Sequence, residues 1–346
     1  MKKIAKWLKN ARSVALPQSL MPAVLAVVMA LGYPGFNLWL ALLAVIGVVM
    51  AHLAMNLTDD YFDYKVDMLG DRDKVIRQGF RAMTVKYPYL TDGSETIKTL
   101  RQAIAQFVAV ACLCGLVIFL VRSFSNFSSF GFVISWWIVA IVAATAFLGV
   151  FYSAPPFKLA YRGLGEPVIG VIFGPLLMMG VFYSAAGFID WAIIGTSIPV
   201  GLLVLNILYT HSFIEKEGDA ASNKMTLARL LGGYRANMIM VYVINFLPYI
   251  LVILSVALGY LHPAYLAVLL VVPRSVWLCS SLKDFAEGRQ DVPEKPYRWL
   301  GPMRDWEPVR ASGVDWFLMR WLTARNILSA FCLVLIIVKL VLLIVL

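Results

Sequence analysis

The stretch Asn56-Leu-Thr-Asp-Asp-Tyr-Phe-Asp-Tyr-Lys-Val-Asp67 follows directly on a long apolar run, residues 37–57, whose one ionisable side chain is His52. If a single helix continues through both, four polar side chains recur at i, i+4, i+7 and i+11 and share one helix face. These residues are Asn56, Asp60, Asp63 and Asp67. Carboxylates this close together repel one another unless a cation neutralises them. Hard oxygen ligands on a shared face suit Mg²⁺, so we predict a magnesium site where this helix leaves the apolar run.

The composition is that of an integral membrane protein. Hydrophobic residues make up 61% of the chain and charged residues 14%, far from the balance of a soluble domain. Runs long enough to cross about 30 Å of hydrocarbon occur at 16–34, 37–57, 103–121, 134–152, 167–186, 191–212, 237–258, 262–280 and 325–346. We predict an all-α membrane protein, a bundle of nine transmembrane helices that forms a single domain over residues 1–346, with residues 288–321 as an interfacial insert anchored by tryptophans.

The net charge of +10 reflects membrane topology rather than nucleic-acid binding. Lys and Arg concentrate in the N-terminal segment and in the loops after the second, fourth, sixth and eighth runs, whereas the loops on the other side contain only Arg122. By the positive-inside rule the N-terminus and the basic loops are cytoplasmic. We expect an integral protein of a bacterial inner membrane, embedded in the lipid bilayer, whose active face is turned toward the cytoplasm and which has no nucleic-acid partner.

A short loop, Tyr152-Ser-Ala-Pro-Pro-Phe-Lys-Leu-Ala-Tyr-Arg-Gly-Leu-Gly-Glu166, separates the fourth and fifth runs. Its two prolines end the preceding helix, and its glycines allow a tight return. The loop therefore holds Lys158, Tyr161 and Arg162 at the membrane surface. Positive-inside topology with interfacial tyrosines would explain the same residues without chemistry.

A second acidic patch follows the sixth run. His211, Glu215 and Asp219 recur every four residues and so share a helix face at an equivalent cytoplasmic exit. Lys224 follows in the next turn. The first patch alone could be a solvated acidic loop, but ionisable residues at two equivalent helix exits favour a functional site. His52 lies one turn before Asn56 and could line the same cavity, or it could be a polar residue satisfied within the bundle.

These features together resemble the UbiA-type intramembrane prenyltransferases. The resemblance rests on three stretches: Asn56 to Asp67, the second acidic patch with Asn223-Lys-Met-Thr-Leu227, and Tyr152 to Glu166. The third is similar to the branch that prenylates 1,4-dihydroxy-2-naphthoate in menaquinone synthesis, as is the entry to the first run, Arg12-Ser-Val-Ala-Leu-Pro17. The match covers roughly residues 10 to 235.

The resemblance implies a Mg²⁺-dependent transfer, with Mn²⁺ as an alternative cation, from a polyprenyl diphosphate to an aromatic acceptor, most simply 1,4-dihydroxy-2-naphthoate, with demethylmenaquinone as the product. The implied catalytic and metal-binding residues are Asp60, Asp63 and Asp67 with Asn56 at the first site, and Glu215 and Asp219 with His211 at the second. The implied substrate-binding residues are Asn56, Lys158, Arg162, Lys224, Arg77, Tyr152 and Tyr161. The apolar interior would take the prenyl tail.

The chain departs from the branch at two places. Asp59 stands where the branch usually has Asn. The second motif usually reads Asn, Asp, Asp at four-residue spacing, and here it reads His211, Glu215, Asp219, which puts the acceptor in question because the second site usually lies beside it. The alternatives are the same fold with another acceptor (a hydroxybenzoate, a phenol or a glycerol-phosphate lipid), a cation transporter or channel, and a scaffold without catalysis.

Overall fold

The computed structural model describes residues 2–68, 87–125, 135–221, 225–303 and 306–345, and in these ranges the regular structure is entirely helical. The α-helices are α1 (Lys2–Asn10), α2 (Pro17–Ala30), α3 (Leu38–Met68), α4 (Pro88–Thr91), α5 (Ile97–Ser125), α7 (Trp136–Ser153), α8 (Gly165–Val171), α9 (Leu177–Ala186), α10 (Trp191–Ile214), α11 (Lys216–Ala221), α12 (Leu227–Leu231), α13 (Tyr234–Ala257), α14 (Val272–Ala286), α15 (Trp306–Ala311) and α16 (Asp315–Val345). Shorter or tighter helical pieces are η1 (Ser13–Ala15), η4 (Leu159–Tyr161), the π-helical η5 (Ile172–Leu176), η6 (Pro263–Val271) and η7 (Arg298–Leu300).

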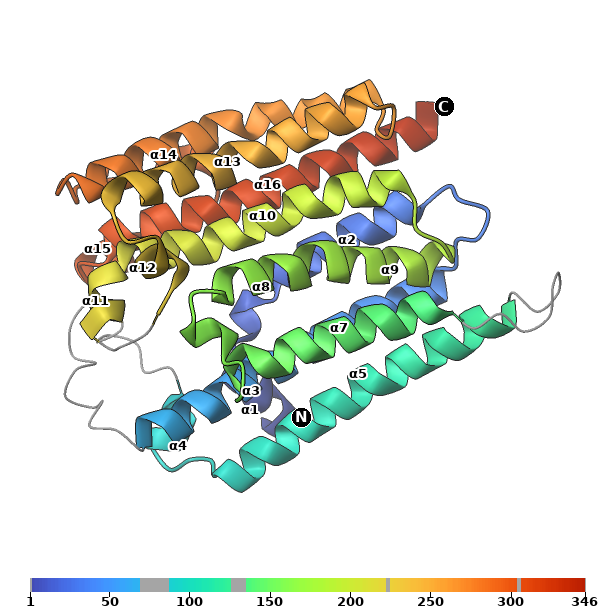
Figure 1. Ribbon diagram of the computed structural model, residues 1–346, viewed down its shortest axis with the longest axis horizontal. Helices are drawn as coiled ribbons and strands as arrows, with labels where there is room; N and C mark the ends of the chain where they lie inside the picture. The colour runs from blue at the N-terminus through green and yellow to red at the C-terminus, as the bar shows by residue number, and fades with distance from the viewer. Residues whose placement is uncertain (1, 69–86, 126–134, 222–224, 304–305, 346) are drawn as a thin grey trace.

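Long apolar helices run side by side and form one layered bundle (Figure 1). Within the described residues, eight helical spans are long and apolar enough to cross a membrane, so the protein is an integral membrane protein. They coincide with eight of the predicted runs. The remaining run, 16–34, corresponds to α2, which has 14 residues and is shorter than a spanning helix needs to be. Its role as a ninth span stays a prediction.

The helix that contains the last predicted span begins ten residues earlier than predicted. Residues 325–346 were expected to form it, with 288–321 as a separate insert, but α16 already begins at Asp315. The charge at Arg320 does not end the helix because its fully buried guanidinium donates to the main-chain carbonyls of Ser281 and Gln290 at 3.0 and 3.1 Å. A buried charge that is hydrogen-bonded in this way is tolerated inside a bundle.

Helix α10 packs against α13, α16, α8, α2 and α9 and so occupies the middle of the bundle. The short helices α4, α11, α12 and α15 gather at the end of the bundle where α3 and α10 finish, and the C-terminus lies at the opposite end (Figure 1). The positions of these short helices define the end of the molecule at which the two acidic patches lie.

Close contact between α10 and the α8–η5 segment depends on small residues. A Cβ at Gly174 would lie 2.4 Å from Cα of Gly201, and a Cβ at Gly201 would lie 2.6 Å from the carbonyl oxygen of Gly170. Real Cβ contacts are longer, so the two backbones approach as closely as they do because these residues have no side chain. Small residues serve the same purpose at many membrane helix interfaces.

Gly174→Ala is therefore expected to lower the free energy of unfolding by about 1–3 kcal/mol through overpacking. Gly115→Ala is the matched control, because a Cβ there meets nothing within 4 Å and Ala is the better helix former. Thermal unfolding in detergent would compare both variants with the wild type. Equal melting temperatures for the two variants would contradict the close approach.

Candidate active site

The first acidic motif lies on the last turns of α3, as the spacing predicted. Helix α3 continues without a break from the apolar run through Asp60 and Asp63. The side chain of Asp60 is fully buried, and both of its oxygens have a protein neighbour. Arg12 Nη2 lies 3.1 Å from Oδ1, and the Tyr89 hydroxyl donates to Oδ2 at 2.9 Å. This carboxylate is therefore held by groups from two other parts of the chain.

Arg12 is a site residue that the sequence analysis did not include. Its guanidinium donates to the carbonyl of Asn56 at 2.9 Å and lies 3.5 Å from Asp59, while the Asn56 amide donates back to the carbonyl of Ala11 at 3.0 Å. Burial opposes the guanidinium charge, but the carboxylates of Asp60 and Asp59 outweigh it, so the pKa of Arg12 is raised. Arg12 is thus a permanent counter-charge for the motif. The signal in the sequence was the arginine that opens the stretch Arg12 to Pro17, directly before η1.

Tyr89 is the second residue that the sequence analysis missed. It belongs to α4, and its ring is buried. Burial and the neighbouring Asp60 carboxylate raise the pKa of its hydroxyl, so Tyr89 remains a neutral hydrogen-bond donor. No local pattern marks it, because the contact with Asp60 joins residues that are 29 positions apart.

The loop between α7 and α8, with the first turn of α8, contacts the first acidic motif and the chain that follows the second. On one side, the Tyr161 hydroxyl donates to Asp63. On the other side, the buried Glu166 carboxylate accepts from the backbone N–H of Leu227 at 3.2 and 3.3 Å, at the start of α12. Gly163 N–H also donates to the carbonyl of Met225 at 3.0 Å. Glu166 therefore fastens the loop to the chain just after the second motif, in the manner of a helix cap.

The second acidic motif spans the end of α10 and the start of α11, and Glu215 lies between the two helices with φ of −92° and ψ of 17°. Glu215 N–H donates to the carbonyl of His211 at 3.0 Å, and Asp219 N–H donates to the carbonyl of Glu215 at 2.8 Å. These i to i−4 bonds lie on either side of the break at Glu215. The side chains of Glu215 and Asp219 are buried, and the His211 ring packs edge-on against Phe317 of α16 at 5.2 Å.

Lys158 and Arg162 lie exposed on the same α7–α8 loop. Arg162 donates to the carbonyl of Pro156 at 3.3 Å. Lys158 and Arg12 both have left-handed backbone conformations, with φ of 47° and 56°, and in the described part of the chain no other non-glycine residue does. Such conformations are unfavourable for residues with long side chains, and both occur beside the acidic motifs.

The structure describes some of the remaining predicted site residues but not all of them. Tyr152 is half-buried at the end of α7, and its hydroxyl faces the backbone of Gly165, where a Cβ would lie 3.3 Å away. Asp67 belongs to α3, but its side chain lies outside the described residues, as do Arg77 and Lys224 entirely. His52 is buried beside Ser19, with Nδ1 2.7 Å from the serine oxygen, and packs against Phe173.

Among the described side chains, no group of three or more His, Cys, Asp and Glu residues converges as a metal site. The donor set nonetheless fits a hard divalent cation by its chemistry, because the two motifs consist mainly of carboxylates. At the first motif Arg12 supplies positive charge to Asp59 and Asp60 within the protein itself.

The sequence profile of the UbiA prenyltransferase family matches residues 19–300, which is most of the chain. The chain belongs to this family. The resemblance predicted from the two acidic motifs and the α7–α8 loop is thereby confirmed. As a UbiA prenyltransferase, the protein is an enzyme of the transferase class.

Similar UbiA prenyltransferases include two named 1,4-dihydroxy-2-naphthoate octaprenyltransferase. The one from Mycobacterium tuberculosis is 26% identical over 239 residues, which cover 69% of this chain and 74% of that one. The one from Bacillus subtilis is 25% identical over 286 residues, covering 81% and 82%. The 2-carboxy-1,4-naphthoquinone phytyltransferase of Synechocystis is 29% identical over 161 residues, 46% of this chain, and the match spans about half (50%) of that relative's length.

Solved structures confirm the fold of the family. A UbiA homolog from Archaeoglobus fulgidus, bound to GPP and Mg²⁺, superposes with a TM-score of 0.56 at 16% identity and covers 92% of this chain and 99% of that one. A digeranylgeranylglyceryl phosphate synthase gives a TM-score of 0.59 at 14% identity, covering 97% and 99%. At these identities the likeness establishes architecture alone.

Proposed function

We propose that this UbiA prenyltransferase transfers a polyprenyl group from polyprenyl diphosphate to 1,4-dihydroxy-2-naphthoate in a Mg²⁺-dependent reaction. The observation that carries the proposal is the α7–α8 loop, which contacts the first motif through Tyr161 and the chain after the second motif through Gly163, beside Glu166 of α8. The same loop exposes Lys158 and Arg162. Basic residues between two acidic motifs suit a diphosphate that is bound together with cations.

The carboxylates supply the oxygen ligands that Mg²⁺ prefers. The residues that would hold it are Asp60, Asp63 and Asp67 with Asn56 at the first motif, and Glu215 and Asp219 with His211 at the second. Support comes from the solved homolog with GPP and Mg²⁺. When bound, the cation supplies positive charge that stabilises the leaving diphosphate. Mn²⁺ has similar ligand preferences and belongs in the same assay.

The chain's own residues bind and orient the donor. Lys158 and Arg162 donate charge-assisted hydrogen bonds to the diphosphate oxygens, and Arg77 and Lys224 add to them. Tyr152 and Tyr161 border the same loop. The apolar helices enclose the prenyl tail and exclude water from the allylic carbon. As the allylic C–O bond breaks, diphosphate leaves with the electron pair, and the electron-rich ring forms the new C–C bond.

The naphthoate acceptor is favoured by the curated relatives, several of which are named for it. With this acceptor the ring also loses its carboxylate as CO₂, which leaves a prenylated naphthoquinol, the reduced form of demethylmenaquinone. We further propose that residues 1–346 form one domain in a bacterial inner membrane with the acidic motifs at the cytoplasmic face. The concentration of Lys and Arg in the loops at that face supports this orientation.

Prenyl transfer by the purified protein in detergent or lipid tests the function directly. A labelled polyprenyl diphosphate would be offered with 1,4-dihydroxy-2-naphthoate, 4-hydroxybenzoate, a phenol and a glycerol-phosphate lipid, each with Mg²⁺, with Mn²⁺ and with chelator. We expect a cation-dependent product with the naphthoate. Product with another acceptor alone would replace the acceptor assignment, and no product from folded protein would refute the proposed enzyme activity.

A further inference from the structure

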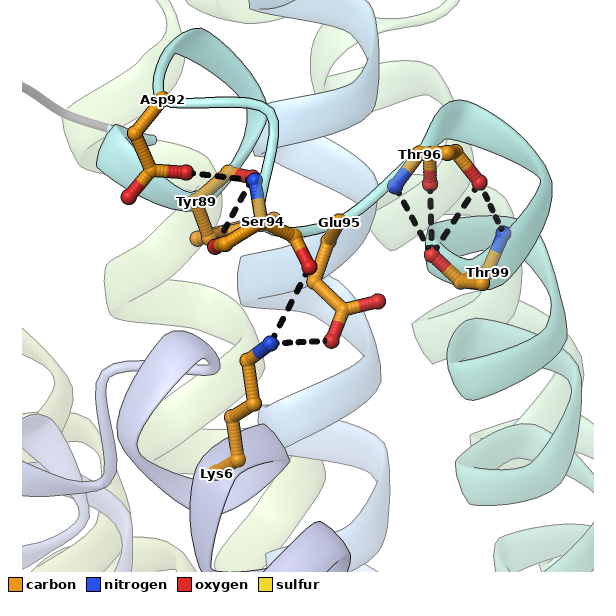
Figure 2. Close-up of polar contacts among 7 residues, drawn as sticks. All are labelled: Lys6, Tyr89, Asp92, Ser94, Glu95, Thr96 and Thr99. Carbon is orange, nitrogen blue, oxygen red and sulfur yellow. Dashed lines mark hydrogen bonds and ion pairs between the residues drawn. The ribbon is translucent and has the colours of Figure 1, made fainter.

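The N-terminal helix α1 is tied to the turn that carries Tyr89. Lys6 Nζ lies 2.7 Å from Oε1 of Glu95 and donates to the carbonyl of Ser94 at 3.1 Å (Figure 2). Trp7 is the next residue of α1, and its ring packs edge-on against Tyr89 with 5.9 Å between ring centroids. Trp7 and Tyr89 both belong to a small buried cluster that also contains Leu53 and Leu57 of α3.

The turn itself is fastened at several points. Ser94 N–H donates to Oδ1 of Asp92 at 2.7 Å (Figure 2), and Glu95 N–H donates to the carbonyl of Tyr89 at 2.9 Å. Thr96 and Thr99 exchange backbone and hydroxyl hydrogen bonds where α5 begins (Figure 2). A turn so constrained transmits the position of α1 to the ring of Tyr89.

The Tyr89 side chain reaches the first acidic motif, where its hydroxyl donates to Asp60. The N-terminal segment reaches the same motif by a second route, through the Arg12 contact with Asp60 and the pair of hydrogen bonds between Asn56 and residues 11–12. We call α1 together with residues 87–95 the N-terminal clamp.

We propose that the N-terminal clamp is a positioning element that holds the Asp60 carboxylate in the orientation required for divalent-cation binding, with Lys6, Glu95 and Tyr89 as its positioning residues. The inference rests on the proposed function, since it concerns the cation of that site. Partners that orient a metal-binding carboxylate strongly influence the affinity for the metal, and their loss typically weakens it by about 10- to 100-fold.

The Lys6–Glu95 pair allows the clamp to be loosened without unfolding the protein. The pair is partly open to water, with the Lys6 side chain 42% exposed and the Glu95 side chain 12% exposed, and ion pairs that water reaches contribute modestly to stability. Reversing one charge separates α1 from the turn by repulsion, and reversing both restores attraction. The variants are Lys6→Glu, Glu95→Lys and the double exchange.

The primary measurement is Mg²⁺ binding to the purified protein without any substrate, by calorimetric titration and by the Mg²⁺-dependent rise in melting temperature. Each single variant is expected to bind Mg²⁺ about three- to tenfold more weakly, and the double exchange is expected to return to within about twofold of the wild type. If the substitutions acted only through their charge on the Mg²⁺ site, Lys6→Glu would bind Mg²⁺ more tightly than the wild type and Glu95→Lys would bind it more weakly. Opposite shifts of that kind would overturn the proposal.

Arg310→Glu is the control, because the Arg310 side chain in α15 is 42% exposed, like that of Lys6, and pairs with Glu294 at 2.9 Å, away from the clamp. Its Mg²⁺ affinity is expected to equal that of the wild type. Tyr89→Phe is the second test, since it keeps the ring contact with Trp7 and removes only the hydroxyl. We expect about tenfold weaker Mg²⁺ binding with a modest fall in melting temperature, because Oδ2 of the buried Asp60 loses its donor.

Unchanged Mg²⁺ affinity in Tyr89→Phe and in both charge reversals would show that the clamp is structural only. Absence of Mg²⁺ binding by the wild type would also overturn the proposal. The proposed function is tested separately, by prenyl transfer. If the wild-type protein binds Mg²⁺ but transfers no prenyl group, the proposed function is refuted, and the Mg²⁺ affinities of the variants still test the role of the clamp.

Discussion

Prenyl transfer by the Asp60→Asn variant is expected to fall by about 100- to 1,000-fold. Asparagine has nearly the same shape and can still accept from the Tyr89 hydroxyl, so the variant removes a charge while it keeps the local packing. The loss arises because a neutral amide is a poor ligand for a hard cation. Initial rates at saturating donor and acceptor, measured across Mg²⁺ concentrations, check this expectation.

Asp59→Asn is the matched control for Asp60→Asn. It is the same change at the neighbouring position, where the Ser153 hydroxyl donates at 2.9 Å and Arg12 lies farther away than it does from Asp60. It also restores the residue that the resembling branch usually has. We expect activity within about threefold of the wild type. Equal losses in the two variants would contradict a specific role for Asp60.

Asp60→Asn is also expected to lower the stability of the folded protein slightly. Arg12 loses its nearest carboxylate and keeps Asp59 at 3.5 Å. Its side chain is 35% exposed, so water compensates in part, and the cost stays below the 3–5 kcal/mol seen when a fully buried pair is broken. A measurable but small drop in melting temperature would separate this effect from the loss of activity.

Asp219→Asn is expected to reduce prenyl transfer by a similar factor, about 100-fold or more, because the proposed role of this fully buried carboxylate depends on its negative charge. Glu217→Gln, two residues earlier in α11 and exposed, is the matched control and should retain wild-type rates. Both variants would be assayed under the conditions used for Asp60→Asn. An active Asp219→Asn enzyme would mean that the second motif does not take part in the reaction.

The altered residues of the second motif can be tested by reversal. The double variant His211→Asn, Glu215→Asp introduces the residues that the resembling branch usually has. Retained or increased transfer to the naphthoate would show that the altered motif serves the same reaction. A loss of transfer that accompanies a new preference among the acceptors would show that these residues help to select the acceptor.

The helical face of the first motif could be predicted because it depends on local periodicity. Asp60 and Asp63 share a face wherever α3 continues as a helix, and the structure confirms that it does. The second motif was predicted in the same way, but the helix breaks inside it at Glu215, between α10 and α11. The spacing of residues was therefore sufficient only where one element holds the whole motif, and the common face of the second motif stays a prediction.

The start of α16 could not be predicted from periodicity. Charged residues between 315 and 321 indicated a surface segment, yet Arg320 is fully buried. Its charge is accommodated by carbonyls from α14 and from the segment after it. The carbonyls that surround a side chain depend on how the helices pack, so the composition of the segment cannot predict them.

The sequence by itself determined the membrane bundle, the side-chain chemistry of the two motifs and their orientation along their own helices, because apolar length and helical repeat are local properties of the chain. Only the tertiary structure decided which groups meet at the site. Arg12 and Tyr89 contact Asp60, and Glu166 meets the backbone of Leu227, across separations of tens of residues. Partners for buried charges are selected when the helices pack together, since each buried carboxylate must then find its donors among the segments brought beside it.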